Sequence, residues 1–283
     1  MKQRIISGVV GVCLLAVVLI LHHTIVFPLA FSAIVGVILF ELIRAIGGLE
    51  FKLSTGAVMS YGILSIILSS LLNEDVFGTG WQIAGIFYSV LMPVCLTLIF
   101  WDYMRHPKTF TIEQGAFMIS AMILVTDSFK MLMTMNHDEN HSLFYVILSL
   151  CGAWIADTGA YFSGVALGKT KLCPEISPKK TVEGFVGGLV SNMLLFILIF
   201  LFYAKGCGLG FGIMEALKSG LLGLVCAGVS VLGDLTASVI KRQKGIKDYG
   251  NIMPGHGGLM DRFDSVLFVI PAFYWCIRIF PIF

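Results

Sequence analysis

The carboxylates and cations of one C-terminal stretch have the composition of a metal and phosphate site. This stretch runs from Gly233 to Asp264 and reads GDLTASVIKRQKGIKDYGNIMPGHGGLMDRFD. Asp234 comes before a basic loop, and Asp261 and Asp264 follow the loop. Magnesium is typically held in proteins by one or two carboxylates together with substrate phosphates. We therefore predict that Asp234 and Asp261 can bind Mg²⁺, with Asp264 as a further ligand or as a partner that orients one.

Asp234 is expected inside a membrane-spanning helix, about 10 Å from its cytoplasmic end, because Lys241 follows seven residues later and a helix rises about 1.5 Å per residue. An ionisable group at that depth is costly and marks a functional site by default. Three polar residues share its helix face, at offsets of four, seven and eight: Ser238, Lys241 and Arg242. The alternative is a buried aspartate that a neighbouring lysine neutralises for packing alone.

The glycine-rich segment before Asp261 is a candidate anion-binding turn. It reads PGHGGLMD, and glycines let backbone amides approach an anion closely. His256 and Gly257 are therefore candidate substrate-binding residues, and Arg262 adds a cation beside them. Two alternatives stay open, since His256 could be an ordinary hydrogen-bonding loop residue and Asp261 could cap the helix that follows.

A second polar loop carries hydroxyls and lysines that could bind a triphosphate. It reads SPKKTVEGFVGG, and its candidate substrate ligands are Ser177, Lys179, Lys180 and Thr181. The lysines alone would also be explained by membrane topology. Upstream, Asp157 is a second intramembrane acid and a further candidate for substrate binding. A buried hydrogen bond to a neighbouring helix is the alternative role for Asp157.

The composition identifies the surroundings of these residues as a membrane. The chain has 283 residues, 57% hydrophobic and 13% charged, with a mean hydropathy of +0.92, whereas soluble domains contain about 45–50% apolar and about 25% charged residues. The net charge of +2 is too small to imply nucleic-acid binding. Since a helix needs about 20 apolar residues to cross the hydrocarbon core, we predict an all-α polytopic integral membrane protein with about nine transmembrane helices, at 5–21, 25–43, 56–72, 81–100, 112–132, 142–166, 184–204, 214–240 and 263–282.

The distribution of lysine and arginine predicts the orientation of these helices. Basic residues collect in alternate loops, which places the N-terminus in the cytoplasm and the C-terminus outside. Both long polar loops, 167–183 and 241–262, then face the cytoplasm, where nucleotides are found. We expect an N-terminal scaffold of about five helices over residues 1–140, a C-terminal catalytic region over residues 141–283, and a location in the inner (cytoplasmic) membrane of a bacterium.

The polar segments together resemble a known family. The run from Ser238 to Asp264, SVIKRQKGIKDYGNIMPGHGGLMDRFD, closely resembles the signature of the phosphatidate cytidylyltransferase family, and GDLTAS, SPKKTVEG and DTGAYFSG are similar to further segments of it. The four segments cover the C-terminal half, while the N-terminal half matches in hydropathy alone. The resemblance implies that CTP and phosphatidic acid give CDP-diacylglycerol and pyrophosphate with magnesium, that Asp234 and Asp261 hold the metal, and that the protein forms a homodimer.

A lipid phosphate oxygen is already anionic near neutral pH, so this reaction needs no strong general base. Positioning and charge neutralisation can carry it, as in other phosphoryl transfers. The residues expected to offset charge on the two substrates and on departing pyrophosphate are Lys179, Lys180, Lys241, Arg242 and Arg262. Two alternatives remain. A CTP-dependent enzyme that acts on an isoprenoid lipid would share the same chemistry, and a cation or proton transporter could use Asp157 and Asp234. The concentration of polar residues on the cytoplasmic side favours the enzyme over the transporter.

Overall fold

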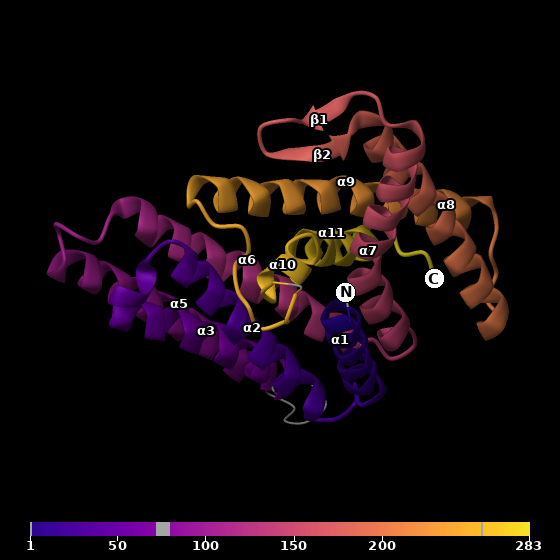
Figure 1. Ribbon diagram of the computed structural model, residues 1–283. Helices are drawn as coiled ribbons and strands as arrows, with labels where there is room; N and C mark the ends of the chain where they lie inside the picture. The colour runs from indigo at the N-terminus through magenta and orange to yellow at the C-terminus, as the bar shows by residue number, and fades with distance from the viewer. Residues whose placement is uncertain (1, 72–79, 256) are drawn as a thin grey trace. The chain divides into compact units, whose positions relative to one another are not determined.

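The computed structural model describes residues 2–71, 80–255 and 257–283, and it is built mainly from helices (Figure 1). The predicted all-α fold class is confirmed. The chain divides into two compact units, residues 1–143 with 244–262 and residues 144–243 with 263–283. The segment 244–262, expected with the C-terminal region, thus belongs to the unit of the N-terminal helices.

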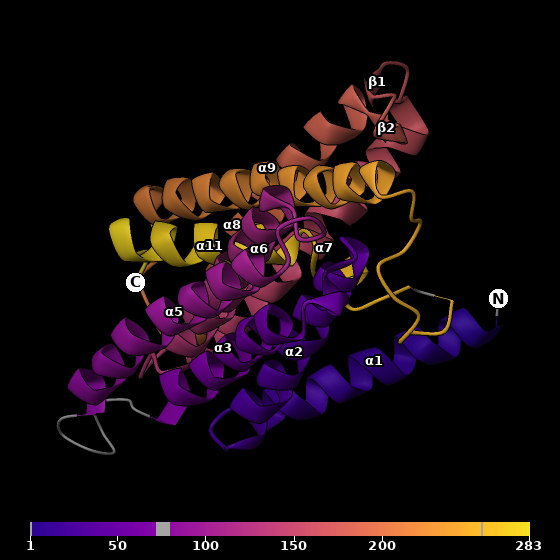
Figure 2. The ribbon, with the colours of Figure 1, turned by 90° about the vertical axis from the view of Figure 1, so that its left-hand side faces the viewer.

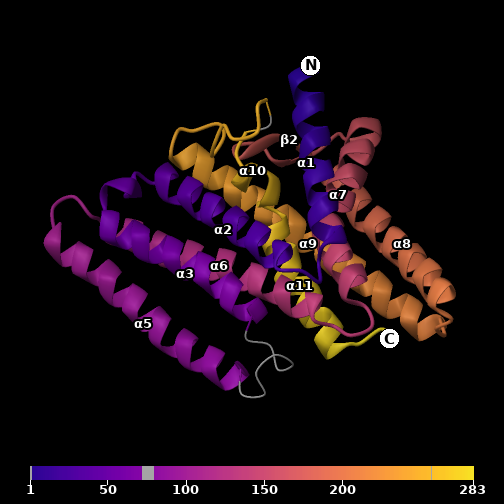
Figure 3. The same cartoon turned by 90° about the horizontal axis from the view of Figure 1, so that it is seen from below.

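The first unit is a bundle in which α3 (Lys52–Leu71) packs against α2 (Val26–Ala45), α5 (Gly80–Arg105) and α6 (Ile112–Asn136). Figure 3 shows α2, α3 and α5 side by side. Gly62 permits the close approach of α3 to α2, because a Cβ atom there would lie 2.5 Å from Leu39 Cδ1. The unit also contains α1 (Lys2–Ile20) and the short 3₁₀ helix η1 (Gly48–Glu50).

Side chains of the first unit satisfy the backbone amides at two helix starts. At α6, Gln114 N donates to Thr111 Oγ1 at 3.2 Å and Thr111 N donates to Gln114 Oε1 at 3.0 Å, which is a capping box. At α3, Asp102 accepts from Ser54 N at 2.8 Å and from Ser54 Oγ at 2.9 Å. Asp102 is buried, and these two hydrogen bonds give its carboxylate a structural role at the start of α3.

The second unit contains α7 (Ser142–Leu167, apart from its first two residues), α8 (Val182–Cys207), α9 (Ile213–Gln243) and α11 (Val266–Ile279). α9 packs against both α8 and α11, and Figures 1 and 2 show α9 running alongside α11. Asn192 Nδ2 of α8 donates to Gly223 O of α9 at 2.8 Å. The predicted loop 167–183 contains an antiparallel hairpin of β1 (Lys171–Cys173) and β2 (Ser177–Thr181), an element that the sequence reasoning did not anticipate.

Within the described residues, seven helices are long and apolar enough to cross a membrane: α2, α3, α5, α6, α7, α8 and α9. Each corresponds to one of the nine predicted transmembrane helices. The predicted first transmembrane helix overlaps α1, which contains the shorter apolar segment Ile6–Ile20. The predicted ninth overlaps α11, which has 14 residues. The predicted fifth transmembrane helix corresponds to α6, which is continuous. Two of its charged residues pair with each other, with Lys130 Nζ 3.2 Å from Asp127 Oδ1.

Candidate active site

Two acids and a lysine from three elements of the second unit form one charged cluster. The elements α7 and β2 carry Asp157 and Lys180, and α9 carries Asp234. Lys180 Nζ lies 2.5 Å from Asp234 Oδ2, with side-chain exposures of 22% and 29%. Asp157 interacts electrostatically with both Lys180 and Asp234. The structure therefore brings together Asp157, Lys180 and Asp234, which lie far apart in the sequence.

Asp264 adds a third carboxylate to this cluster. It lies in the turn between α10 (Met260–Phe263) and α11, outside the helices long enough to cross the membrane. The pKa of the Asp264 carboxyl is raised to about 7, first by burial and then by the charge of Asp234, while the Ser265 amide and Lys241 oppose the rise. Near neutral pH this carboxyl is protonated part of the time, so the cluster carries less than three full negative charges.

The prediction that Ser238 shares a face of α9 with Asp234 is confirmed. Ser238 Oγ donates to Asp234 Oδ1 at 3.4 Å, four residues along the helix. Arg242 turns to the hairpin, where Arg242 Nε donates to Ile176 O at 3.4 Å. In the structure Arg242 thus joins the end of α9 to the β1–β2 turn, and its contact with a substrate phosphate stays a prediction.

The candidate residues of the hairpin have different surroundings along β2. Lys180 meets Asp234, while Lys179 is exposed. Thr181 Oγ1 accepts from Gly184 N at 3.1 Å and caps α8. Ser177 pairs with Cys173 across the hairpin. Substrate binding by Ser177, Lys179 and Thr181 stays a prediction.

We expect Lys180→Met to lower kcat/KM by about 10²–10³-fold, because the loss of one preorganised charged donor from a reaction site costs that much. The matched control is Lys171→Met, which removes the same charge from an exposed position of the same hairpin, and which should change kcat/KM less than about twofold. Steady-state kinetics on the two purified variants would measure the difference, and equal losses would show that general surface charge is responsible.

Gly233 sets the distance between α9 and the turn that carries Asp264. A Cβ atom at Gly233 would lie 2.7 Å from Asp264 O and 2.9 Å from Ser265 Cα, both backbone atoms that cannot move cheaply. Residue 233 therefore has to be glycine for Asp234 and Asp264 to approach within one cluster.

We expect Gly233→Ala to lower the free energy of unfolding by about 1–3 kcal/mol, as overpacking does, and to reduce turnover as the two acids are pushed apart. Gly228→Ala is the control on the same helix, because nothing lies within 4 Å of its added Cβ atom, and an alanine there should be neutral or stabilising. Thermal unfolding in detergent would compare the two. A stable, active Gly233→Ala variant would contradict the packing argument.

In the first unit, Asp261 holds the polar loop 244–262 in shape. Its Oδ2 atom accepts from Tyr249 N at 2.8 Å and from Gly258 N at 3.0 Å. Gly257 has a φ of 87°, which favours glycine, and a Cβ atom there would lie 2.8 Å from Asp261 Oδ2 and 3.3 Å from Asp248 Oδ1. The carboxylates of Asp248 and Asp261 thus both lie beside Gly257, and Asp248 is a residue that the sequence analysis did not select.

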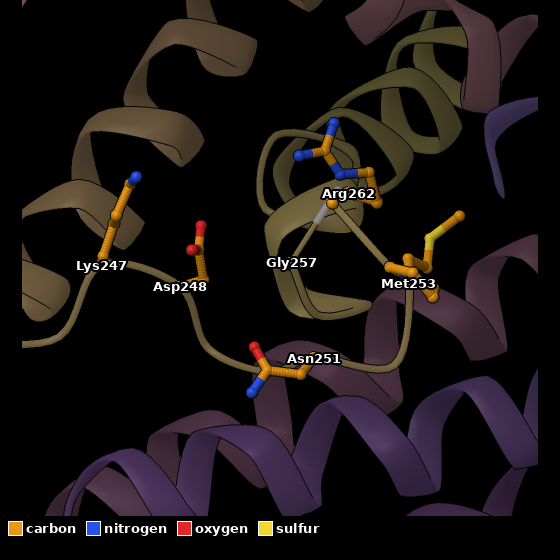
Figure 4. Close-up of a pocket in the computed structure, with 8 residues that line it drawn as sticks. Lys247, Asp248, Asn251, Met253, Gly257 and Arg262 are labelled. Atoms are coloured by element: carbon orange, nitrogen blue, oxygen red, sulfur yellow. The ribbon is translucent and has the colours of Figure 1, made fainter. Parts of the chain in front are cut away.

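The same loop lines an open cavity of about 600 Å³, within the usual range for small-molecule sites. Figure 4 shows the side chains of Lys247, Asp248 and Arg262 extending from their backbones in one direction at this cavity. The predicted substrate residues Gly257 and Arg262 both line it, together with Lys247, Asp248, Asn251, Met253, Pro254 and Gly255. His256, also predicted to bind substrate, lies outside the described residues.

The donor atoms near Asp234 suit magnesium in kind. They are carboxylate oxygens, the ligands that Mg²⁺ prefers, and it commonly takes one or two of them and completes its shell with phosphates and water. Among residues 2–71, 80–255 and 257–283, no group of three or more His, Cys, Asp or Glu side chains could hold a metal ion by itself. Asp234 belongs to the second unit and Asp261 to the first, so their joint binding of a metal stays a prediction.

Glu41 is a buried acid, like Asp102, that the sequence analysis did not select. It lies near the end of α2 and is 1% exposed. The rule that selected Asp157 and Asp234, that an acid inside a span marks a functional site, applies equally to Glu41. It was passed over because the N-terminal helices were expected to serve as scaffold.

Comparison with known proteins identifies the family. The sequence matches the model of the Cytidylyltransferase family over residues 2–280. A phosphatidate cytidylyltransferase of Bacillus subtilis (strain 168) is 35% identical over 284 residues, covering 99% of this chain and 98% of the relative. A phosphatidate cytidylyltransferase of Staphylococcus saprophyticus is 30% identical over 271 residues, covering 96% of each chain. One of Aquifex aeolicus (strain VF5) is 47% identical over 133 residues, 47% of each chain.

These matches extend the resemblance from the polar segments of the C-terminal half to nearly the whole length of the chain. The chain belongs to the cytidylyltransferase family and is a nucleotidyltransferase.

Proposed function

We propose that this enzyme transfers CMP from CTP to phosphatidic acid, giving CDP-diacylglycerol and pyrophosphate, with Mg²⁺ as cofactor. The observation that carries the proposal is the cluster of Asp157, Lys180 and Asp234 together with Asp264. The names of the relatives support phosphatidic acid as the acceptor lipid. The product is a precursor in phospholipid biosynthesis.

In the proposed reaction, an oxygen of the phosphatidic acid phosphate attacks the α-phosphorus of CTP. The new P–O bond forms as the bond from the α-phosphorus to the bridging oxygen of the β-phosphate breaks, and pyrophosphate leaves with that electron pair. The attacking oxygen is already anionic, so no residue has to remove a proton. The chain's task is to hold two anionic substrates in line and to offset their repulsion.

Lys180 and Lys241 are proposed to offset charge on the triphosphate, since both interact with the acids of the cluster. Asp234 and Asp261 are the proposed magnesium ligands. A bound magnesium ion would neutralise phosphate charge and polarise the P–O bonds. Asp157 is proposed to bind and orient Lys180, with which it interacts electrostatically. The proposed location is the cytoplasmic membrane of a bacterium, with the nucleotide site facing the cytoplasm.

A lipid-substrate panel tests this proposal. Purified protein is mixed with Mg²⁺ and radiolabelled CTP, and with phosphatidic acid, a polyprenol or a polyprenyl phosphate in separate reactions. We expect a CDP-lipid and one equivalent of pyrophosphate with phosphatidic acid alone. Product with an isoprenoid acceptor alone would move the enzyme to the alternative lipid class. Replacement of Mg²⁺ by EDTA should stop turnover, and undiminished turnover in EDTA would refute the metal requirement.

A further inference from the structure

Glu41 ties the loop 244–262 to the N-terminal helices. Its two carboxylate oxygens accept from two consecutive amides, Oε1 from Leu259 N at 3.2 Å and Oε2 from Met260 N at 2.8 Å. The residues that Glu41 joins are more than 200 positions apart in the sequence. Both bonds lie within the first unit, immediately before Asp261.

Two glycines of the loop leave the space that the Glu41 carboxylate fills. A Cβ atom at Gly250 would lie 2.0 Å from Glu41 Oε1, and one at Gly258 would lie 2.4 Å from Oε1 and 2.5 Å from Oε2. Any larger residue at either position would displace the carboxylate. The Glu41 carboxylate therefore lies between two segments of the loop, Tyr249–Gly250 on one side and Gly258–Met260 on the other.

Arg44 provides a second bond from the same helix. Its Nη2 atom donates to the carbonyl oxygen of Tyr249, whose side chain is 1% exposed. The amide of Tyr249 donates to Asp261 Oδ2. Arg44 and Tyr249 thus link α2 to the carboxylate of Asp261. Glu41 contacts the backbone just before Asp261, at Leu259 and Met260.

We propose that Glu41, supported by Arg44, is a positioning residue that holds the loop 244–262 in place and thereby orients Asp261. This inference rests on the proposed function, since it takes Asp261 to be part of the catalytic machinery. A carboxylate used for packing alone would be costly at 1% exposure. Here both oxygens accept amide hydrogens from the one segment that leads into Asp261, which assigns Glu41 a role in the geometry of the site.

The first experiment measures the loop without reference to activity. Amide hydrogen exchange at Leu259 and Met260 is compared in wild-type protein, Glu41→Ala and Glu41→Gln, without substrates. Protection of the two amides from exchange should fall at least about tenfold in Glu41→Ala, because the loop can then open without breaking hydrogen bonds to Glu41. Glutamine offers one acceptor oxygen in place of two, so Glu41→Gln should keep protection at one amide.

The second experiment measures catalysis. We expect Glu41→Ala to lower kcat with CTP and phosphatidic acid by about 10²-fold, since a small misplacement from a distant substitution can cost that much. Glu41→Gln should retain more of the wild-type kcat than Glu41→Ala does. The control is Leu39→Ala on the same helix, which packs against Gly62 of α3. It should lower the melting temperature while the exchange at residues 259 and 260 stays at the wild-type rate.

A size-compensation test ties the effect to contact between Glu41 and the loop. Gly258→Ala alone should impair turnover about as much as Glu41→Ala, because the new methyl group displaces the carboxylate. In the Glu41→Ala background the methyl group has no carboxylate to displace. Gly258→Ala should therefore cause little further loss of turnover. Additive losses would contradict a shared mechanism.

The outcomes separate the two hypotheses. Wild-type exchange at residues 259 and 260 in Glu41→Ala would overturn the anchoring role, and altered exchange with wild-type kcat would overturn the positioning role. If wild-type protein makes no CDP-lipid, the proposed function fails, and the exchange data still decide whether Glu41 holds the loop.

Discussion

Replacing Asp234 with asparagine is expected to reduce turnover by about 10³-fold or more while the protein stays folded. Asp234 is central to the charged cluster: it pairs with Lys180 at 2.5 Å and interacts with Asp157 and Asp264. An asparagine of nearly the same shape keeps the packing but removes the charge that pairs with Lys180 and that the proposed magnesium ion would need. A loss of this size corresponds to about 4 kcal/mol of transition-state stabilisation.

The stability of Asp234→Asn should change little, because two electrostatic effects oppose each other. The variant loses the attraction between Asp234 and Lys180, and it also removes the repulsion that Asp234 exerts on Asp157 and Asp264. Thermal unfolding in detergent, measured on the same preparation as turnover, would show this. A variant that loses turnover because it no longer folds would leave the catalytic role of Asp234 without support.

Glu215→Gln is the matched control for Asp234→Asn. It removes one carboxylate charge from the opposite end of α9, where Glu215 Oε2 accepts from Gly212 N at 2.8 Å. Its kcat should stay within about twofold of the wild-type value. Full activity in Asp234→Asn would refute both the proposed metal ligand and the charge cluster as the site of reaction.

Replacing Asp261 with asparagine is the second change expected to have a large effect, again about 10³-fold in kcat. The reason differs from that for Asp234, since Asp261 Oδ2 also accepts the amides of Tyr249 and Gly258. Asparagine keeps an oxygen that can accept both bonds, so the loop should retain its shape while the charge is lost. Asp261→Ala should lose both the charge and the loop.

Trypsin cleavage at Lys247, an exposed residue of the loop, separates the two effects. Asp261→Asn should be cleaved at the wild-type rate, and Asp261→Ala faster. The control is Asp138→Asn, because Asp138 Oδ1 accepts from Asn140 N at 3.1 Å and from His141 N at 2.7 Å in the same manner, away from the site. Normal turnover in Asp261→Asn together with low turnover in Asp261→Ala would make Asp261 a loop anchor with no part in the chemistry.

Much of the helical framework could be predicted from the sequence, because hydropathy over about 20 residues is a local property. Seven of the nine predicted spans correspond to helices long enough to cross a membrane among the described residues. The contact between Ser238 and Asp234 is equally local, since residues four apart share a helix face. The hairpin at 171–181 was missed, because two short polar strands have no apolar alternation to reveal them.

The site itself was predicted in part. Asp234, Lys180 and Asp157 were each selected by residue type, and the structure brings them together. The spacing of Arg242 placed it correctly on α9 but could not show that it turns to Ile176 of the hairpin. Thr181 caps α8. Its position immediately before Val182 is compatible with this role, but the sequence analysis considered Thr181 as a phosphate ligand alone.

The sequence by itself determined which residues are polar within an apolar chain, which of them share a helix face, and the family to which the pattern belongs. Only the tertiary structure decided that Lys180 meets Asp234, that its neighbour Lys179 is exposed, and that Glu41 holds the backbone beside Asp261. The physical reason is range. Periodicity and helix spacing report neighbours within a few residues, whereas these contacts join positions tens to hundreds of residues apart, where packing alone sets the distance.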